Sequence, residues 1–339
     1  MAAGSPNSLW IERRRGDTRL APADSQGPNG QVIVVQDHAP WYSGMRLEGR
    51  IIEVDHRNGW AWLDLPAIQE TGFLNLNRQQ ALREGERLPV TILSERDEAQ
   101  KALPVQLATE SCDTAKPSQA TDWLARICQR FAWESLPLYE VQPHNSEARQ
   151  ALDRAEARAA RETIPLTQGR VLIDQTRAGW MLDVNGSAAL ATNQEAAQAI
   201  AQAIRCANLA GLLVIDFLPL PDKAGRRAVR DTLAAGLASD PLQQDVGVMD
   251  HRGIVVVHRQ RWGESLIELI NRPDSAALAS LRSWEAALRA GARGRFRLTA
   301  LPSLLPWLKP LAEGIAAQWS VTLEWRSPQA AAPLSWSQA

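Results

Sequence analysis

The sequence predicts an α/β protein that also carries a separate all-β unit. From residue 168 onward, short apolar runs alternate with stretches whose apolar residues recur at helical spacing, as is typical of an α/β unit. Between residues 44 and 108, short runs are separated by polar or glycine-bearing turns, which is typical of a small β-barrel. The 339 residues suffice for two or three compact units.

The composition limits the classes of function. The net charge is −1, so any affinity for a polyanion must come from local patches. Arginine carries most of the positive charge, and the lysines are Lys101, Lys116, Lys223 and Lys309. The three cysteines, Cys112, Cys128 and Cys206, have the spacing of neither a disulfide framework nor a zinc knuckle, which predicts a reducing, cytoplasmic location. The N-terminus lacks a signal-peptide pattern, and no apolar run approaches the roughly 20 residues that span a membrane.

The β unit, residues 44–108, is expected to hold five strands in a barrel of the oligonucleotide-binding kind. Four of the strands are read at Arg46–Val54, Gly59–Leu65, Gly72–Leu76 and Leu88–Ser94. Before this unit, Ile11–Arg15, Thr18–Leu20 and 31–35 are read as short strands. After it, 109–121 is a polar linker, followed by a short amphipathic helix at Asp122–Phe131 and a largely exposed helix at Ser146–Thr163.

The α/β part is expected to alternate regularly. Its predicted strands are Arg170–Asp174, Gly179–Val184, Leu212–Phe217, Val246–Met249, Ile254–His258, Arg295–Thr299 and Val321–Trp325. Its predicted helices are Asn193–Cys206, Lys223–Ser239, Ser275–Ala290 and Ser303–Gln318. The last dozen residues are rich in Pro, Ala and Ser, which predicts a frayed tail.

Two aspartates near the carboxyl ends of apolar strands are the first candidates for chemistry. If the strands that carry Asp183 and Asp216 are neighbours, the two carboxylates face each other and repel unless a cation lies between them. Mg²⁺ takes such oxygen ligands and keeps several waters, one of which can attack a phosphodiester. Asn185 lies two residues after Asp183 and so points to the same side of the strand. The alternative is that both aspartates cap strand ends or pair with arginines.

Two other groups compete for a functional role. Asp174 also ends an apolar strand, and turn chemistry favours a role in capping the hairpin that leads to Gly179. Four basic residues share one helix face after the second aspartate and could hold a phosphate backbone, or form an ordinary solvated face: Lys223, Arg226, Arg227 and Arg230.

Six ordered segments resemble the catalytic region of the ribonuclease E/G family: Val171–Thr176, Leu182–Asn185, Thr192–Ala197, Gly211–Phe217, Arg226–Val229 and His258–Arg261. The resemblance implies that Asp183 and Asp216 are the metal-binding aspartates, with Asn185 as their companion. It implies Mg²⁺, with Mn²⁺ as a substitute. The implied reaction is hydrolysis of single-stranded RNA, leaving a 5′-phosphate and a 3′-hydroxyl.

The same resemblance implies the nature of the units. It divides the chain into N-terminal strands of a shortened RNase-H-like unit (1–43), an S1-like barrel (44–108), a linker (109–121), the rest of the RNase-H-like unit (122–167), a DNase-I-like α/β subdomain (168–272), a small α/β appendage (273–327) and a disordered tail (328–339). In the barrel, Trp62 and Phe73 take the place of base-stacking aromatics and Lys101 that of a basic residue. The alternative is that Trp60, Trp62 and Phe73 are barrel core, and the strand pattern favours some of them as core.

The chain also departs from the family's pattern. The region that senses a 5′-monophosphate is missing, and the loop after Asn185 is cut to Gly186–Ala191 without a basic residue. The paired cysteines that link subunits through zinc are absent, so neither zinc nor a zinc-linked tetramer is expected. Val256 stands where the family carries an acidic residue. Three functions therefore stay open: an RNA endonuclease, an RNA-binding homologue with weakened catalysis, and a metal-dependent hydrolase of another phosphodiester.

Overall fold

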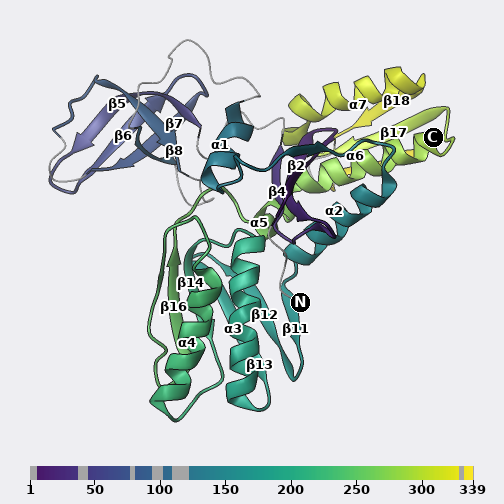
Figure 1. Cartoon of the computed structure of the whole chain (residues 1–339). Coiled ribbons are helices and arrows are strands. Elements are labelled where there is room, and N and C mark those ends of the chain that lie inside the picture. Colours follow the sequence, from purple (N-terminus) through teal and green to yellow (C-terminus); the bar gives the residue numbers. More distant parts are fainter. Residues whose placement is uncertain are drawn as a thin grey trace.

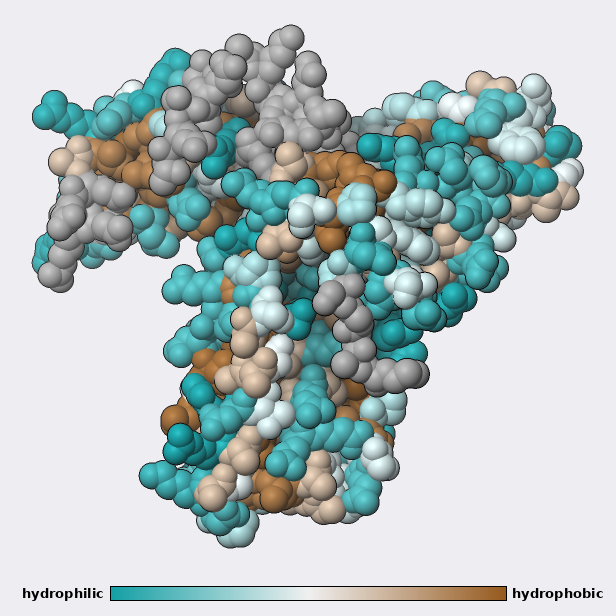
Figure 2. Space-filling model, in the orientation of Figure 1, coloured by the Kyte–Doolittle hydropathy of each residue, from teal (hydrophilic) through white to brown (hydrophobic). Residues whose placement is uncertain are grey.

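The computed structural model describes residues 6–36, 45–76, 81–93, 102–108, 122–327 and 332–338. Three lobes are visible: the barrel, an α/β unit and a lobe that joins the N-terminal strands to the C-terminal helices (Figure 1). The lobes remain distinct in the space-filling view (Figure 2). No helix in the described ranges is long and apolar enough to cross a membrane. The structure confirms the predicted combination of mixed α/β architecture with a β-barrel.

The barrel is closed by five strands in the order β5-β6-β7-β9-β8. Their bounds are β5 (Arg46–Asp55), β6 (Trp60–Leu65), β7 (Glu70–Asn75), β8 (Arg87–Ile92) and β9 (Leu103–Leu107). Alternate residues point inward, and on β6 these are Ala61, Leu63 and Leu65, all fully buried. Four strands match the stretches read from the sequence, and β9 is the fifth.

The N-terminal sheet combines chain segments from both sides of the barrel in sequence. Its strands are β1 (Ser8–Arg14), β2 (Asp17–Asp24), β3 (Gly27–Pro28), β4 (Ile33–Gln36) and β10 (Leu138–Glu140), with β10 parallel to β1. Helices α1 (Asp122–Arg130) and α2 (Ser146–Ala159) pack on it. The expectation that α2 is largely exposed holds for one face only, because Ala148, Leu152, Ala155 and Ala159, at helical spacing, form a buried stripe on the other.

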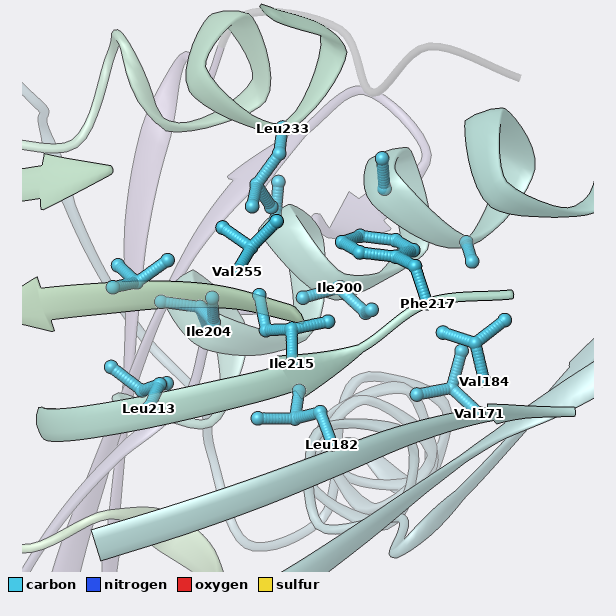
Figure 3. Close-up of a cluster of buried hydrophobic side chains, with 14 of the residues drawn as sticks. Val171, Leu182, Val184, Ile200, Ile204, Leu213, Ile215, Phe217, Leu233 and Val255 are labelled. Atoms are coloured by element: carbon cyan, nitrogen blue, oxygen red, sulfur yellow. The ribbon is translucent and has the colours of Figure 1, made fainter. Parts of the chain in front are cut away.

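The α/β unit is a six-stranded sheet in the order β11-β12-β13-β14-β16-β15. The strand bounds are β11 (Thr163–Leu166), β12 (Gly169–Thr176), β13 (Gly179–Gly186), β14 (Gly211–Asp216), β15 (Gln244–Val246) and β16 (Ile254–Arg259). Helices α3 (Ala189–Cys206) and α4 (Lys223–Leu237) cover one face, where Leu182, Ile215 and Val255 meet Ile200 and Leu233 (Figure 3).

The boundary predicted at residue 167 is wrong by one strand. The helix before it ends at Ala159, and Thr163–Leu166 pairs antiparallel with β12 as an edge strand of the α/β sheet. The reason is local: Ile164 and Leu166 alternate with their neighbours and pack against the core of that sheet.

The C-terminal unit packs helices on one face of a three-stranded sheet of order β18-β17-β19. Its elements, together with the connecting α5, are α5 (Leu266–Ile270), α6 (Pro273–Arg289), β17 (Arg295–Ala300), the 3₁₀ turn η1 (Pro302–Leu304), α7 (Leu305–Trp319), β18 (Thr322–Arg326) and β19 (Leu334–Gln338). A frayed tail was expected over 328–339, and this is wrong for β19, which pairs with β17 along Ala300–Phe296. Leu334 is buried in the core, and Trp336 contacts Phe296 with ring centroids 6.2 Å apart.

A buried network of ion pairs ties α2 and α6 to the N-terminal sheet. Asp17 accepts hydrogen bonds from Arg14, at 2.6 Å, and from Arg282 of α6, at 3.0 Å. Arg19, with only 1% of its surface exposed, pairs with Glu12 and, at 2.8 Å, with Glu156 of α2. Each buried charge therefore has a partner, as burial requires.

Candidate functional site

The structure brings Asp183 and Asp216 together. Strands β13 and β14 are parallel neighbours, and the two aspartates are the last register partners between them, where β14 ends. Neighbouring strands lie about 4.8 Å apart, and register partners project from the same face. Leu182 and Val184, on either side of Asp183, point into the core beneath α3 and α4. The carboxylates therefore leave the sheet on the face opposite those helices.

The environment of Asp216 disfavours its negative charge. Burial raises the pKa of this carboxyl above its ordinary value, and the charges of Asp183 and then Asp250 raise it further. A cation placed between the carboxylates would reverse the effect of both neighbouring charges. The local electrostatics therefore suit the binding of a cation at this edge of the sheet.

Asn185 is a direct partner of the pair. Its side-chain Nδ2 donates a hydrogen bond of 2.7 Å to Oδ2 of Asp183. Positions two apart on a strand share a face, which explains the contact. The bond fixes the rotation of the Asp183 carboxylate and leaves Oδ1 of the same group as the oxygen for a further ligand.

Asp250 is a third acidic residue of the site, and the strand pattern in the sequence did not indicate it. Its Oδ1 accepts hydrogen bonds from the backbone N–H groups of Ile254 (2.9 Å) and Arg252 (2.8 Å), which lower the pKa of Asp250. Ile254 begins β16 and is the register partner of Asp216, so the turn lies beside that aspartate. The signal in the sequence was an aspartate three residues before Gly253, which is typical of a tight turn.

The strand end that carries Asp216 is held from two sides. Asn193 of α3, fully buried, donates from Nδ2 to the carbonyl of Leu218 at 2.7 Å, and its Oδ1 accepts from the N–H of Leu218 at 3.0 Å. On the other side, the N–H of Phe217 donates to the carbonyl of Gly253 at 3.1 Å. A Cβ on Gly253, whose φ is +105°, would lie 2.1 Å from the carbonyl oxygen of Phe217, so this approach requires glycine.

Asp174 does not close the hairpin before β13. The turn is closed by Thr176, whose hydroxyl donates to the carbonyl of Gly179 at 2.8 Å and accepts from the N–H of Ala178 at 3.3 Å. Asp174 is exposed within β12 and is the register partner of Met181. The predicted capping role is therefore wrong, because the strand continues past Asp174 to Thr176.

The basic residues of α4 lie on the other layer from the carboxylates. Arg226 donates to the carbonyls of Leu220 and Pro221, and Arg230 donates to the carbonyl of Val246 at 2.9 Å. Arg226 therefore holds the loop before α4, and Arg230 holds the end of β15. The others predicted to share their helix face, Lys223 and Arg227, are exposed, with Arg227 3.5 Å from Asp231.

The aromatic side chains of the barrel form a surface on its outside. Trp60, Trp62 and Phe73 are half-buried and lie outside the barrel core, so the prediction that some of them are core is wrong. Trp62 and Phe73 are register partners whose rings meet edge-on at 5.4 Å, and the ring of Trp60 lies 6.5 Å from that of Phe73. We call these three residues the aromatic platform. Lys101, predicted to accompany them, lies outside the described residues.

The donor set at the strand ends fits a hard divalent cation. The two carboxylates offer oxygen ligands of the kind that Mg²⁺ uses while it keeps several waters, and the Asn185 amide orients one of them. Within the described ranges, no group of three or more His, Cys, Asp or Glu side chains is arranged to hold a metal ion.

Away from the site, burial raises the pKa of Cys206 to about 11, which keeps this thiol protonated at neutral pH.

The fold and the site define a multidomain α/β protein with an OB-like barrel and a pair of aspartates on two central strands of its main sheet. Residues 78–262, more than half of the chain, match the profile of the Ribonuclease E/G family, and the chain belongs to that family.

Similar proteins are ribonucleases by name. Ribonuclease G of Escherichia coli (strain K12) is 30% identical over 141 residues, which are 38% of this chain and 27% of that protein. The chloroplastic Ribonuclease E/G-like protein of Arabidopsis thaliana is 26% identical over 176 residues, 48% of this chain and 17% of that one. Ribonuclease E of Synechocystis sp. is 27% identical over 150 residues, 41% of this chain and 21% of its own length. The matches thus span about a quarter or less of these relatives.

Among solved structures, a multidomain protein with nucleic acid binding domains from Streptococcus pneumoniae is similar at 12% sequence identity. The alignment covers 51% of this chain and 64% of that one, with a TM-score of 0.19. A likeness of this size carries no argument about the function.

Proposed function

We propose that this chain is a metal-dependent endoribonuclease that cleaves single-stranded RNA by attack of water on a phosphodiester. The observation that carries the proposal is the register pairing of Asp183 with Asp216, within the segment that matches the Ribonuclease E/G profile. The names of the similar proteins supply the substrate class.

Each polar residue of the site has a separate role in the proposed reaction. Asp183 and Asp216 would hold Mg²⁺, which when bound lowers the pKa of a water and neutralises charge on the phosphate. Asn185 keeps the Asp183 carboxylate in one orientation. Asp250 adds negative potential beside Asp216 and so strengthens the attraction for a cation. In the reaction, the water oxygen joins phosphorus and the bond from phosphorus to O3′ breaks, which leaves a 5′-phosphate and a 3′-hydroxyl.

The barrel would supply RNA binding. Bases of any sequence stack on aromatic side chains, and each stacked base contributes about 1–3 kcal/mol. The aromatic platform offers half-buried rings on the outside of the barrel, where a flexible strand can reach them. Single-stranded RNA exposes its bases and fits such a surface better than a duplex does.

A second candidate function is RNA binding without catalysis. The aromatic platform is built independently of the carboxylates, so it would persist if the acidic pair were inactive. The segment Gly186–Ala191, which follows Asn185 directly, carries no basic residue that could hold a phosphate near the carboxylates, which favours this alternative.

One experiment separates the two functions. A fluorogenic single-stranded RNA is incubated with the protein in Mg²⁺ and in EDTA, alongside Asp183→Asn and Asp216→Asn. The matched control is Asp174→Asn, which removes an exposed carboxylate from the same face of the same sheet. The nuclease proposal predicts cleavage by the wild type and the control in Mg²⁺ only, and loss of cleavage in either site variant.

Binding of RNA without metal-dependent cleavage would contradict the nuclease proposal. A wild type that binds the RNA yet cleaves it no faster than Asp183→Asn establishes the binding function and ends the nuclease proposal. A single-stranded DNA of the same sequence, offered in parallel, tests whether another phosphodiester is the substrate.

A further inference from the structure

A cleft of about 460 Å³ lies between the barrel and the rest of the molecule. The barrel contributes Arg46, Thr91 and Gln106 to its walls. Gln129 and Arg130, at the end of α1, and Trp262, after β16, line the opposite side. The walls therefore carry two guanidinium groups, amides, a hydroxyl and an indole, which is a lining suited to an anionic chain with flat groups.

The barrel wall of the cleft continues into the aromatic platform. Thr91 is the register partner of both Arg46 and Gln106, so these three side chains form one row across β5, β8 and β9. On β9, Pro104 lies two residues from Gln106 on the same outer side, and Pro104 is the register partner of Phe73. The outer surface of β9 thus joins the platform to the cleft.

Arg130 gives the far wall of the cleft a positive charge. Its guanidinium donates to the side-chain amide of Gln260 rather than to a carboxylate, and its Nε is buried without a hydrogen-bond partner. Burial and then the charge of Arg259 lower the pKa of Arg130, and the charge of Asp240 acts in the opposite direction. Asp240 pairs with Arg259 at 2.7 Å, so Arg130 and Arg259 together bring two positive charges against one carboxylate. A phosphate placed near Arg130 would therefore be attracted.

Trp262 supplies a rigid apolar wall. Its ring meets that of Phe131 edge-on at 5.3 Å, and Phe131 stacks at 5.0 Å on Trp133. A fixed indole beside a guanidinium is the combination that binds nucleotides through stacking and phosphate contact.

We propose that one single-stranded RNA both stacks on the aromatic platform and continues over β9 into this cleft, where Arg46 and Arg130 bind its phosphate backbone. The inference rests on the proposed function for its substrate class. The cleft would be a second RNA-binding site, separate from the aromatic platform, and the RNA would pass between the barrel and the rest of the molecule.

The test is equilibrium binding of labelled oligouridylates in EDTA, so that cleavage plays no part. An oligomer of about 4 nucleotides would cover the platform alone, and one of about 12 would reach the cleft. Arg130→Met is expected to weaken binding of the long oligomer about tenfold and that of the short one less than twofold. The slope of log K against log salt should fall by about 0.7 for each phosphate that the variant no longer binds. Arg130→Lys, which keeps the charge, should retain most of the affinity.

A second variant does not depend on Arg130. Gln106 is exposed on β9, and Gln106→Glu places a negative charge in the cleft without a change of size. It should weaken the long oligomer severalfold, whereas the same change at exposed Gln198 of α3 should have no effect.

The outcomes are distinguishable. If Arg130→Met and Gln106→Glu bind the long oligomer like the wild type while Trp62→Ala binds it weakly, the cleft proposal is overturned and RNA binding by the platform stands. If Trp62→Ala also binds the long oligomer like the wild type, the barrel does not bind RNA, and the proposals for the platform and for the cleft are both overturned. A peptide or protein that binds the cleft and is not displaced by the long oligomer would also overturn the RNA path.

Discussion

Asn185 donates its amide hydrogen to Asp183 across 2.7 Å, from the position two residues further along the same strand. The bond holds one carboxylate oxygen, so it fixes how the second oxygen is presented. Residues that orient a metal-binding carboxylate act on catalysis through that carboxylate and leave binding of the substrate unchanged.

Asn185→Ala should therefore lower kcat by about 10–100-fold and change KM for RNA little. The measurement is steady-state cleavage at saturating and at limiting Mg²⁺. Gln175→Ala, which removes an exposed amide from the neighbouring strand, is the control and should cleave like the wild type. A loss that appears only in KM would contradict an orienting role for Asn185.

Asp183→Asn should lower the pKa of Asp216, because the charge of Asp183 is one of the causes that raise it. Burial remains, so part of the upward shift should persist. In the wild type, the raised pKa of Asp216 stabilises the folded state at pH values below about 3.9, the ordinary pKa of an aspartate. This contribution is lost as the pH rises through the pKa of Asp216 in the folded protein. Carboxyl ¹³C NMR titration without metal measures the change. An Asp216 titration that is identical in wild type and variant would show that the two groups do not interact.

Asn193→Ala should lower the free energy of unfolding by about 1–3 kcal/mol, because the partly buried N–H and carbonyl of Leu218 lose their partners. It should also weaken Mg²⁺ binding, since the segment after Asp216 is no longer held. Urea denaturation and calorimetric titration with Mg²⁺ check the two effects. Gln198→Ala, on the exposed side of the same helix, is the control. Tight Mg²⁺ binding by a destabilised Asn193→Ala would argue against the positioning role.

Trp62→Ala should weaken RNA binding by about 1–3 kcal/mol with little effect on the thermal midpoint, because the ring lies outside the barrel core. Leu63→Ala, one residue away and fully buried, should do the reverse and cost about 2–5 kcal/mol of stability. Fluorescence anisotropy and thermal melting separate the two. If both variants lose stability equally, Trp62 is a packing residue.

Arg19→Met should lower the free energy of unfolding by about 3–5 kcal/mol, because it leaves Glu12 buried with one cationic partner fewer. Arg13→Met is the contrast: its pair with Glu140 is exposed and should contribute at most about 1 kcal/mol. Urea denaturation of both variants makes the comparison. Equal losses would show that the buried network is not what holds α2 to the N-terminal sheet.

The sequence allowed much of the α/β sheet to be predicted, since its central strands are apolar runs bounded by turns. The positions of Asp183 and Asp216 at strand ends could be predicted from those runs. That β13 and β14 are parallel neighbours in this register could not, because strand pairing over 30 residues depends on how the intervening helix packs. Asp250 was missed for the same reason: its turn is placed beside the site by the pairing of β16 with β14.

Other errors came from packing that a local pattern does not show. The buried face of α2 consists mostly of alanines among charged residues, so its amphipathic pattern is weak. Strand β19 is stabilised by β17, about 40 residues away in the sequence, and by the contact of Trp336 with Phe296. Trp62 was ambiguous because an aromatic at alternating spacing fits either face of a barrel strand.

The ion pair between Asp17 and Arg282 joins positions 265 residues apart. At roughly 5–20 residues per second, a ribosome needs tens of seconds to supply Arg282 after Asp17 has been made. During that interval the N-terminal strands would lack one of the ion pairs of the folded lobe, and a chaperone would have time to bind them. The lobe is complete only after α6 has left the ribosome, so a chain truncated before α6 would leave Asp17 without its ion pair to Arg282.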